Sequence, residues 1–237
     1  MAKQKRAFEK IAEQVRNYVY EQKLMPGDRL SSERELAVQF GSGRMVVREA
    51  LRVLEQSGLI YVKHGGDGGS YVKGVDRSVV SGSISDVMRR GSMGLGHLTE
   101  VRIGVEKLVI GVAMARISHS ELELLEKRLE DAEAILETST QEGTPPDFSR
   151  WAECNIQFHM VIAQATGNPL YVMILGSLMD VVRSFFTDIA IVPEFLEAHM
   201  RDHRAIYEAV KSKDLRLAER RLEEHSLQLE RSLAFTK

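Results

Sequence analysis

Two short amphipathic helices joined by a tight turn constrain the fold of this chain more than any other feature. They occupy residues 31–58, SSERELAVQFGSGRMVVREALRVLEQSG. Each helix has an apolar face at helical spacing, made in the first by Leu36, Ala37 and Phe40 and in the second by Val47, Ala50, Leu51 and Leu54. Because only Gly-Ser-Gly separates them, the two helices cross and the second projects its outer face. The pattern predicts a helix-turn-helix.

The outer face of the second helix is basic, because Arg44, Arg48 and Arg52 lie on one side of it. Charge is also distributed unevenly along the whole chain, with an excess of basic residues in its first part. Residues 1–73 hold 13 Lys and Arg against 9 Asp and Glu, whereas the rest of the chain holds 19 against 25. If the protein binds a polyanion, we therefore expect the first part of the chain to do so.

The segment before these helices supplies a third one. Residues 7–24 have apolar and aromatic side chains at helical spacing, and Pro26-Gly27 ends the segment with a turn. Ser32, with Glu35 three residues later, is the signature of a capping box at the start of the next helix.

The segment after the two helices is predicted to form a β-hairpin. Residues 59–63 (LIYVK) and 70–73 (SYVK) favour strands, and a glycine-rich tip at 64–69 joins them. A tip with His64 and several glycines can approach a phosphate backbone or a minor groove closely. The alternative is a loose hairpin loop without function. Three helices followed by a hairpin make a winged helix-turn-helix.

The motifs PGD, ERELA, R-x-x-x-REAL and GLI, followed by this hairpin, resemble the DNA-binding domain of the GntR family of bacterial transcription regulators over residues 8–73. The resemblance implies contacts with double-stranded DNA by Arg34, Arg44 and Arg48, and contacts with the minor groove by His64 and Gly65. Arg44 begins the helix that enters the major groove in such domains, and arginine reads guanine with two hydrogen bonds.

The chain departs from this family pattern at the turn. The family usually has Val-Ser-Arg or Val-Thr-Arg where this chain has Ser42-Gly43-Arg44, and often threonine in place of Met45 or Val46. Gly43 offers no hydroxyl to a phosphate, and Met45 offers DNA only an apolar contact, for instance with a thymine methyl. We therefore expect an operator different from the commonest ones of the family. A surface arginine is otherwise more often solvated or ion-paired, and Arg52 is interpreted as solvated.

The chain is predicted to be mainly α-helical, with three parts. These are a winged helix-turn-helix at residues 1–75, a Gly- and Ser-rich linker at 76–97 with a short helix around 84–90, and an all-α antiparallel bundle of six or seven helices at 98–237. The bundle helices are expected at 98–116, 119–138, 149–166, 169–190, 194–212 and 214–235.

The T-x-x-R-x-x-x-E run at 99–106 and ATGNP at 165–169 resemble the FCD-type effector-binding bundle of the FadR branch of the family. The resemblance implies a divalent metal site whose matching positions are Asn155, His159, His203 and His225. Three imidazoles and an oxygen ligand suit zinc or nickel and leave positions open for water or an effector. Asn155 stands where aspartate is common and is a weaker ligand. The alternatives are buried histidines with ordinary hydrogen-bond partners, or pairing of His203 with His199.

Arg102 has two interpretations as well. It lies four residues before Glu106, a spacing that favours a salt bridge within one helix. The resemblance implies instead that Arg102 binds the carboxylate of an effector, such as a hydroxy acid or a sugar acid.

These observations predict a dimeric, ligand-controlled transcription regulator, most often a repressor in this architecture, that binds a palindromic operator. A zinc hydrolase built on the histidines is the rival interpretation. The sequence has no HExxH, G-x-S-x-G, P-loop or Rossmann motif and no general base at a telling spacing, so we expect no enzyme. An architectural DNA-binding protein would leave the large helical part unexplained. A single cysteine, Cys154, and the lack of a spanning or signal segment predict a cytoplasmic protein with no membrane partner.

Overall fold

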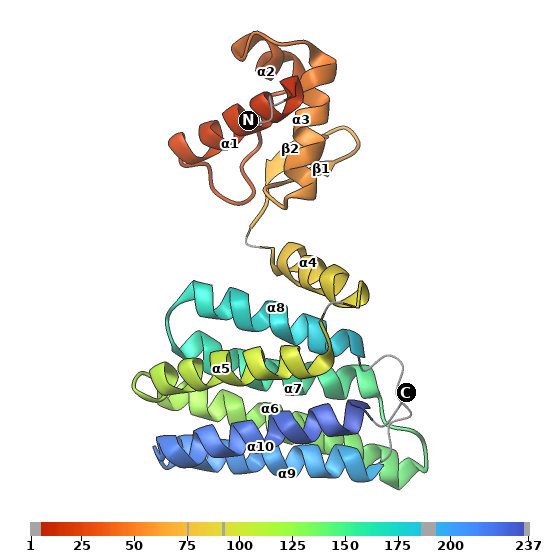
Figure 1. The fold of residues 1–237 in the computed structure, drawn as a ribbon, viewed down its shortest axis with the longest axis vertical. Coiled ribbons are helices and arrows are strands. Elements are labelled where there is room, and N and C mark those ends of the chain that lie inside the picture. Colours follow the sequence, from red (N-terminus) through yellow and green to blue (C-terminus); the bar gives the residue numbers. More distant parts are fainter. Residues whose placement is uncertain (1–5, 75, 92, 186–192, 235–237) are drawn as a thin grey trace. The chain divides into compact units, whose positions relative to one another are not determined.

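The computed structural model describes residues 6–74, 76–91, 93–185 and 193–234 (Figure 1). The chain divides into two compact units, Met1–Val79 and Val80–Lys237. Each unit has its own hydrophobic core. Within the described residues, the structure is helical apart from one two-stranded sheet in the first unit.

The first unit is the predicted winged helix-turn-helix. Its elements are α1 (Ala7–Glu21), α2 (Glu33–Gln39), α3 (Arg44–Gln56), β1 (Ile60–Lys63) and β2 (Gly69–Val72). The strands pair antiparallel with Ile60 opposite Val72, and we call β1, β2 and the loop between them the wing. Ser32 accepts a hydrogen bond from the Glu35 amide, and the Glu35 carboxylate accepts one from the Ser32 amide, which confirms the capping box.

Apolar side chains from every element of this unit meet in one core. Val15, Leu36, Val47 and Leu54 are fully buried, and Ile60 is 1% exposed. Removing such side chains from water is the main stabilising term for a small domain. The core fixes how α2 and α3 cross and therefore which face α3 presents to solvent.

The linker helix is longer than predicted. A short helix was expected around residues 84–90, but α4 spans Arg77–Arg89. Serine and glycine are poor helix formers, so the sequence pattern placed its start too late. Ile84 and Met88, one turn apart, pack against a hydrophobic cluster of the second unit, and this packing stabilises a helix that local propensity does not favour.

The second unit is a helical bundle, as predicted. Its helices are α5 (Leu95–Met114), α6 (His119–Glu142), α7 (Phe148–Ala165), α8 (Pro169–Phe185), α9 (Pro193–Lys211) and α10 (Leu215–Ala234), and α4 packs against them. Residues 186–190 of the helix expected at 169–190 lie outside the described residues, as does residue 235. None of the described helices is both long and apolar enough to cross a membrane.

The bundle encloses α7 on most sides. Figure 1 shows its helices running side by side, and α7 contacts α5, α6 and α8. Trp151 and Phe158 of α7 are 1% exposed, and Ala152, Asn155 and Ile156 between them are buried too. Since α7 carries Asn155 and His159, both predicted ligands lie in the interior of the bundle.

A matched pair of leucines tests this core. Leu125 of α6 is fully buried, whereas Leu108 of α5 is 63% exposed. We expect Leu125→Ala to lower the free energy of unfolding by about 2–5 kcal/mol, because it removes buried methyl groups and leaves a cavity. Leu108→Ala should change it by less than about 0.5 kcal/mol. Urea unfolding followed by the fluorescence of Trp151, the one tryptophan of the chain, measures both. Equal effects would contradict the packing described here.

Candidate functional site

The start of α3 presents an unpaired arginine to solvent. Arg44 is the first residue of α3 and is exposed, and no ion pair holds it within the described residues. Met45 beside it is 64% exposed. The helix cap, Gly43, makes no side-chain hydrogen bond. Arg34 on α2 is also exposed, so these three predicted DNA contacts are all accessible.

Arg48 has a partner that the sequence did not reveal. Its Nε and Nη2 atoms donate to the two carboxylate oxygens of Glu33 at 2.9 and 2.8 Å. Hydrogen bonding to Arg48 lowers the pKa of Glu33. This bidentate pair joins α2 to α3, so Arg48 stabilises the crossing of the two helices. Arg52, interpreted as solvated, is exposed and forms an ion pair of 2.7 Å with Glu49.

Two hydrogen bonds hold the loop of the wing in shape. Arg29 donates from Nη2 to the Gly68 carbonyl at 2.6 Å, and the Tyr71 hydroxyl donates to the Asp67 carbonyl at 2.8 Å. A Cβ at Gly69 would lie 2.9 Å from Arg29 Nε, so glycine is required for this close approach. No pattern in the sequence indicated this role of Arg29.

The exposed end of the wing carries both predicted minor-groove contacts. His64 and Gly65 are exposed at the tip. Gly65 has a φ of +106°, a backbone conformation that favours glycine.

The second unit brings three histidines together at its centre. His159 of α7, His203 of α9 and His225 of α10 are at most 3% exposed. Each offers a ring nitrogen within 4.8 Å of the others, and the Nε2 atoms of His159 and His203 are 3.0 Å apart. We call these three residues the histidine cluster. The predicted set is therefore brought together, with Asn155 one turn before His159 on α7.

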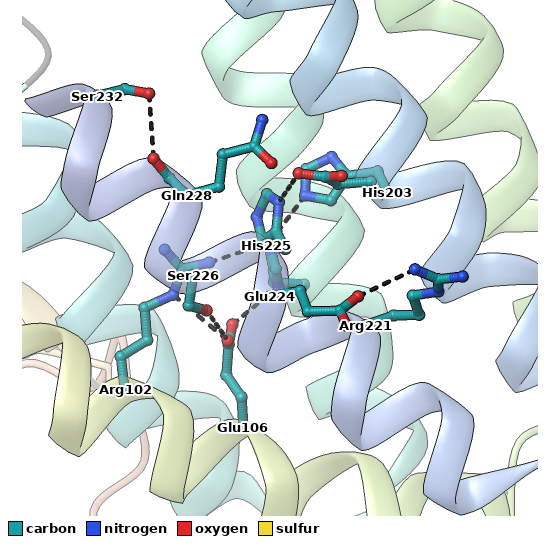
Figure 2. Close-up of polar contacts among 11 residues, drawn as sticks. Arg102, Glu106, His203, Arg221, Glu224, His225, Ser226, Gln228 and Ser232 are labelled. Atoms are coloured by element: carbon teal, nitrogen blue, oxygen red, sulfur yellow. Dashed lines mark hydrogen bonds and ion pairs between the residues drawn. The ribbon is translucent and has the colours of Figure 1, made fainter.

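Arg102 and Glu106 of α5 lie beside this cluster (Figure 2). Glu106 Oε1 is 2.8 Å from His159 Nδ1, and Glu106 Oε2 is 3.3 Å from Arg102 Nε. Arg102 Nη2 also lies 3.3 Å from His159 Nε2. Arg102 thus pairs with Glu106 within its helix, as its spacing suggested, and also reaches the site. Burial by itself would raise the pKa of Glu106, but the positive charge of Arg102 and the contact with His159 lower it to about 2.

The sequence interpretation missed Glu106 as a neighbour of the histidines. No acidic group was expected beside them, because spacing along one helix does not show which residues of other helices lie near. Glu106 reaches His159 from a different helix, and its sequence signals were the i,i+4 spacing from Arg102 and its place at the end of the T-x-x-R-x-x-x-E run. His199, considered as an alternative partner of His203, is buried next to the cluster but is not one of the three residues whose ring nitrogens converge.

Several ligand atoms in the site are buried and unused. His203 Nδ1, both ring nitrogens of His225 and Asn155 Oδ1 lack hydrogen-bond partners within the described residues, and the Asp202 carboxylate lies 3.7 Å from His225 Nδ1. Burial holds the pKa of His203 and of His225 well below 6.5, so both rings are neutral near pH 7. The amide nitrogen of Asn155 donates to the Trp151 carbonyl at 2.7 Å, which leaves its oxygen free. Neutral imidazoles and a free amide oxygen are suitable ligands for a divalent cation.

A small cavity lies beside Asn155 and His159. It has a volume of about 20 Å³ and is lined by Arg102, Asn155, His159, Trp151 and His199, together with apolar side chains. That volume is enough for about one water molecule. A larger groove of about 580 Å³, lined by residues such as Arg128, Arg150 and Cys154, shares no residue with it. We regard the small cavity as the candidate site, because Arg102, Asn155 and His159 line it and the rest of the histidine cluster contacts His159.

Comparisons with known proteins agree with both parts of this description. Residues 7–72 match the model of the bacterial regulatory proteins, gntR family, and residues 97–228 match that of the FCD domain. The chain is 27% identical over 226 residues to the HTH-type transcriptional repressor NanR of Cronobacter sakazakii, covering 93% of this chain and 83% of the relative. The protein of the same name from Escherichia coli is also 27% identical, with 82% of the relative covered.

Solved structures share the fold. A GntR protein of Streptococcus agalactiae matches with a TM-score of 0.67 at 23% identity, covering 95% of this chain and 99% of that one. Escherichia coli McbR/YncC matches with a TM-score of 0.52 at 19% identity, covering 98% of each chain.

A pair of arginine variants tests the face of α3. We expect Arg44→Ala to weaken binding to DNA by about 1–3 kcal/mol, because an arginine that contacts a base makes two hydrogen bonds with it. Arg52→Ala, which removes the same charge from an ion-paired position, should change affinity much less. Fluorescence anisotropy on the tightest fragment selected from a random DNA library measures both at one salt concentration. Equal losses would show that Arg44 contributes only its charge.

A pair of glutamate variants tests the buried charges. The folded pKa of Glu106, about 2, lies below its ordinary value of 4.5. Its stabilising effect is therefore complete above about pH 4.5 and is lost as pH falls toward 2. We expect Glu106→Gln to lower the free energy of unfolding at pH 7 by about 3–5 kcal/mol and to flatten its decline at acid pH.

The control is Glu223→Gln, because Glu223 forms a half-exposed ion pair with Lys107 at 2.7 Å. It should change stability by less than about 1 kcal/mol. Urea unfolding of both variants between pH 3 and 7, in protein freed of metal by a chelator, gives the comparison. A Glu106→Gln protein as stable as the control would rule out the buried pair.

Proposed function

Because the chain belongs to the GntR family of bacterial regulatory proteins and carries an FCD domain, we propose that this DNA-binding transcription regulator is controlled by a small carboxylate bound beside its histidine cluster. The chain is a regulator and not an enzyme. The observation that carries the proposal is the centre of the bundle, where a buried guanidinium lies beside neutral imidazoles with unused ring nitrogens. Buried polar atoms without hydrogen-bond partners destabilise a helical bundle, and binding a ligand would give them partners.

We infer that the histidine cluster holds a divalent cation, with zinc the first candidate and nickel the second. Metal–nitrogen bonds of about 2.0–2.1 Å place neighbouring ligand nitrogens about 3–3.4 Å apart, and the 3.0 Å between His159 and His203 fits that range. Asn155 would supply the oxygen ligand. Glu106, 2.8 Å from His159 Nδ1, would fix the orientation of that ring, as carboxylates beside metal-binding histidines do.

A bound cation would also change what Arg102 does. Arg102 Nη2 lies 3.3 Å from His159 Nε2, the nitrogen whose lone pair would bind the cation. The guanidinium would have to give up this contact and would then be free for another partner. Arg102 and Glu106 have opposite charges, and the carboxylate of Asp202, 3.7 Å from His225 Nδ1, would offset at most one of the two charges of the cation, so the site would keep a net positive charge. A buried site of this kind favours an anion, and a guanidinium binds a carboxylate with two hydrogen bonds. Hydroxy acids and sugar acids are the effector classes we expect.

The packing around the small cavity suggests how binding reaches the DNA-binding unit. Val182 and Leu229 line the cavity and also belong to the cluster against which Ile84 and Met88 of α4 pack. An effector larger than the present volume of about 20 Å³ would push these two side chains apart. The chain continues from α4 directly into the first unit. A coupling of about 1–3 kcal/mol would change DNA affinity by about 5- to 150-fold.

We further propose that the protein acts in the cytoplasm as a homodimeric repressor. Two copies of α3 would address the two half-sites of a palindromic operator. The similarity to proteins named transcriptional repressors supports repression over activation.

Metal content tests the cluster directly. We expect the purified protein, dialysed against zinc or nickel, to retain about one ion per chain, and the His159→Ala/His203→Ala double variant to retain none, because two of three nitrogen ligands are lost. Elemental analysis by mass spectrometry measures both. The exposed His119→Ala is the control and should not change the metal content. Equal, negligible metal in the wild type and the double variant would end the metal proposal.

A screen of small carboxylic acids tests the regulator as a whole. We expect at least one hydroxy or sugar acid to raise the melting temperature of the zinc-loaded protein, and to do so less without zinc. The same acid should release the selected DNA fragment. Arg102→Lys keeps the positive charge beside Glu106 but loses the planar fork, so it should bind the acid more weakly. An acid that stabilises the protein without changing its affinity for DNA would contradict the switch.

A further inference from the structure

One wall of the small cavity is made by Trp151 and His199, which the proposed function does not use. Trp151 is 1% exposed and is the one tryptophan of the sequence. Phe148 stacks on its ring with the centroids 5.6 Å apart, and the His199 ring centroid lies 5.1 Å away. The indole is therefore held in place at the edge of the site.

The indole N–H of Trp151 is buried and has no hydrogen-bond partner within the described residues. Buried donors in folded proteins nearly always have a partner, and one without a partner destabilises the fold. The cavity beside it has room for about one water molecule, with a volume of about 20 Å³. One polar atom of a ligand could take the place of that water. Because the indole can only donate, this atom must be an acceptor such as oxygen.

His199 connects this wall with the histidine cluster. It is 6% exposed, and its ring centroid lies 4.6 Å from that of His203 and 4.4 Å from that of His225. It is not one of the three residues whose ligand atoms converge, so a metal in the cluster would not occupy its ring nitrogens. A neutral imidazole has one nitrogen that accepts a hydrogen bond, for instance from a hydroxyl.

We propose that Trp151 determines the specificity of the effector site by donating its N–H to a hydroxyl oxygen of the effector. The inference rests on the proposed function, because Arg102 must hold the carboxylate. Arg102 and Trp151 line one cavity of about 20 Å³, so the hydroxyl belongs on the carbon next to the carboxylate. This hydroxyl accepts from Trp151 and can donate to His199. The site therefore prefers 2-hydroxy acids to acids of the same length without the hydroxyl, which leave the N–H unpaired.

Lactate and propionate test this preference, because they differ by one hydroxyl. Binding of each acid, with both lactate enantiomers, is measured by calorimetry on the zinc-loaded full-length protein. We expect one enantiomer of lactate to bind about 5- to 10-fold more tightly than propionate, the usual effect of one hydrogen bond. In Trp151→Phe the two acids should bind within about 2-fold of each other. Phe148→Leu, which removes the neighbouring ring and keeps the indole N–H, should retain the preference.

A second measurement needs no variant at Trp151 and covers the case in which Trp151→Phe does not fold. Hydrogen bonding of the indole N–H shifts tryptophan emission to longer wavelength. We expect lactate, and not propionate, to shift the emission of the wild-type protein in this way.

Three outcomes would overturn the inference alone, and a fourth would overturn the carboxylate effector with it. Equal binding of lactate and propionate by the wild type would overturn this inference alone. A preference that survives in Trp151→Phe, or emission that does not respond to bound lactate, would do the same. If no carboxylic acid in the wider screen bound the zinc-loaded protein, both this inference and the carboxylate effector of the proposed function would be wrong.

Discussion

The buried pair of Arg102 and Glu106 is the interaction on which the centre of the bundle depends. Both side chains are at most 3% exposed, and neither charge is tolerable there without the other. Glu106 also contacts His159, so the pair fixes the position of α7 relative to α5. His203 and His225 nearby keep ring nitrogens without hydrogen-bond partners within the described residues. A bundle selected for stability alone would fill this volume with apolar side chains. The polar centre is therefore best explained by a ligand.

The same region suggests how an effector that binds in the bundle could affect the DNA-binding unit. Val182 and Leu229 line the small cavity and also belong to the hydrophobic cluster against which α4 packs. Close-packed interiors transmit displacement because they contain little free volume. A site with room for about one water molecule cannot accept an effector without moving its walls. The small volume thus links binding to a change of packing under α4, which a large preformed pocket would not do.

Features that depend on local periodicity could be predicted from the sequence, whereas contacts between residues far apart in the chain could not. The helix-turn-helix, the capping box at Ser32 and the bundle helices follow from spacings of three, four and seven residues. The spacing of Asn155 and His159 likewise placed both side chains on one face. The contacts of Glu106 with His159, of Glu33 with Arg48 and of Arg29 with Gly68 join residues 15 to 53 positions apart, and no local pattern encodes them. The extent of α4 was missed for the same reason, because tertiary packing determines it.

The amide at position 155 is the one place where the site departs from the pattern of the FadR branch, and charge suggests why it is tolerated. With a divalent cation bound, the charges of Arg102 and Glu106 would cancel, and Asp202 would offset at most one of the two charges of the cation. Aspartate at position 155 would lower the remaining positive charge by one more while binding the cation more tightly. Asn155 would therefore exchange metal affinity for attraction of an anion. Its amide nitrogen donates to the Trp151 carbonyl, a bond that a carboxylate could not form. This hydrogen bond holds the side chain of Asn155 in one orientation and connects it to Trp151, whose indole N–H has no partner within the described residues.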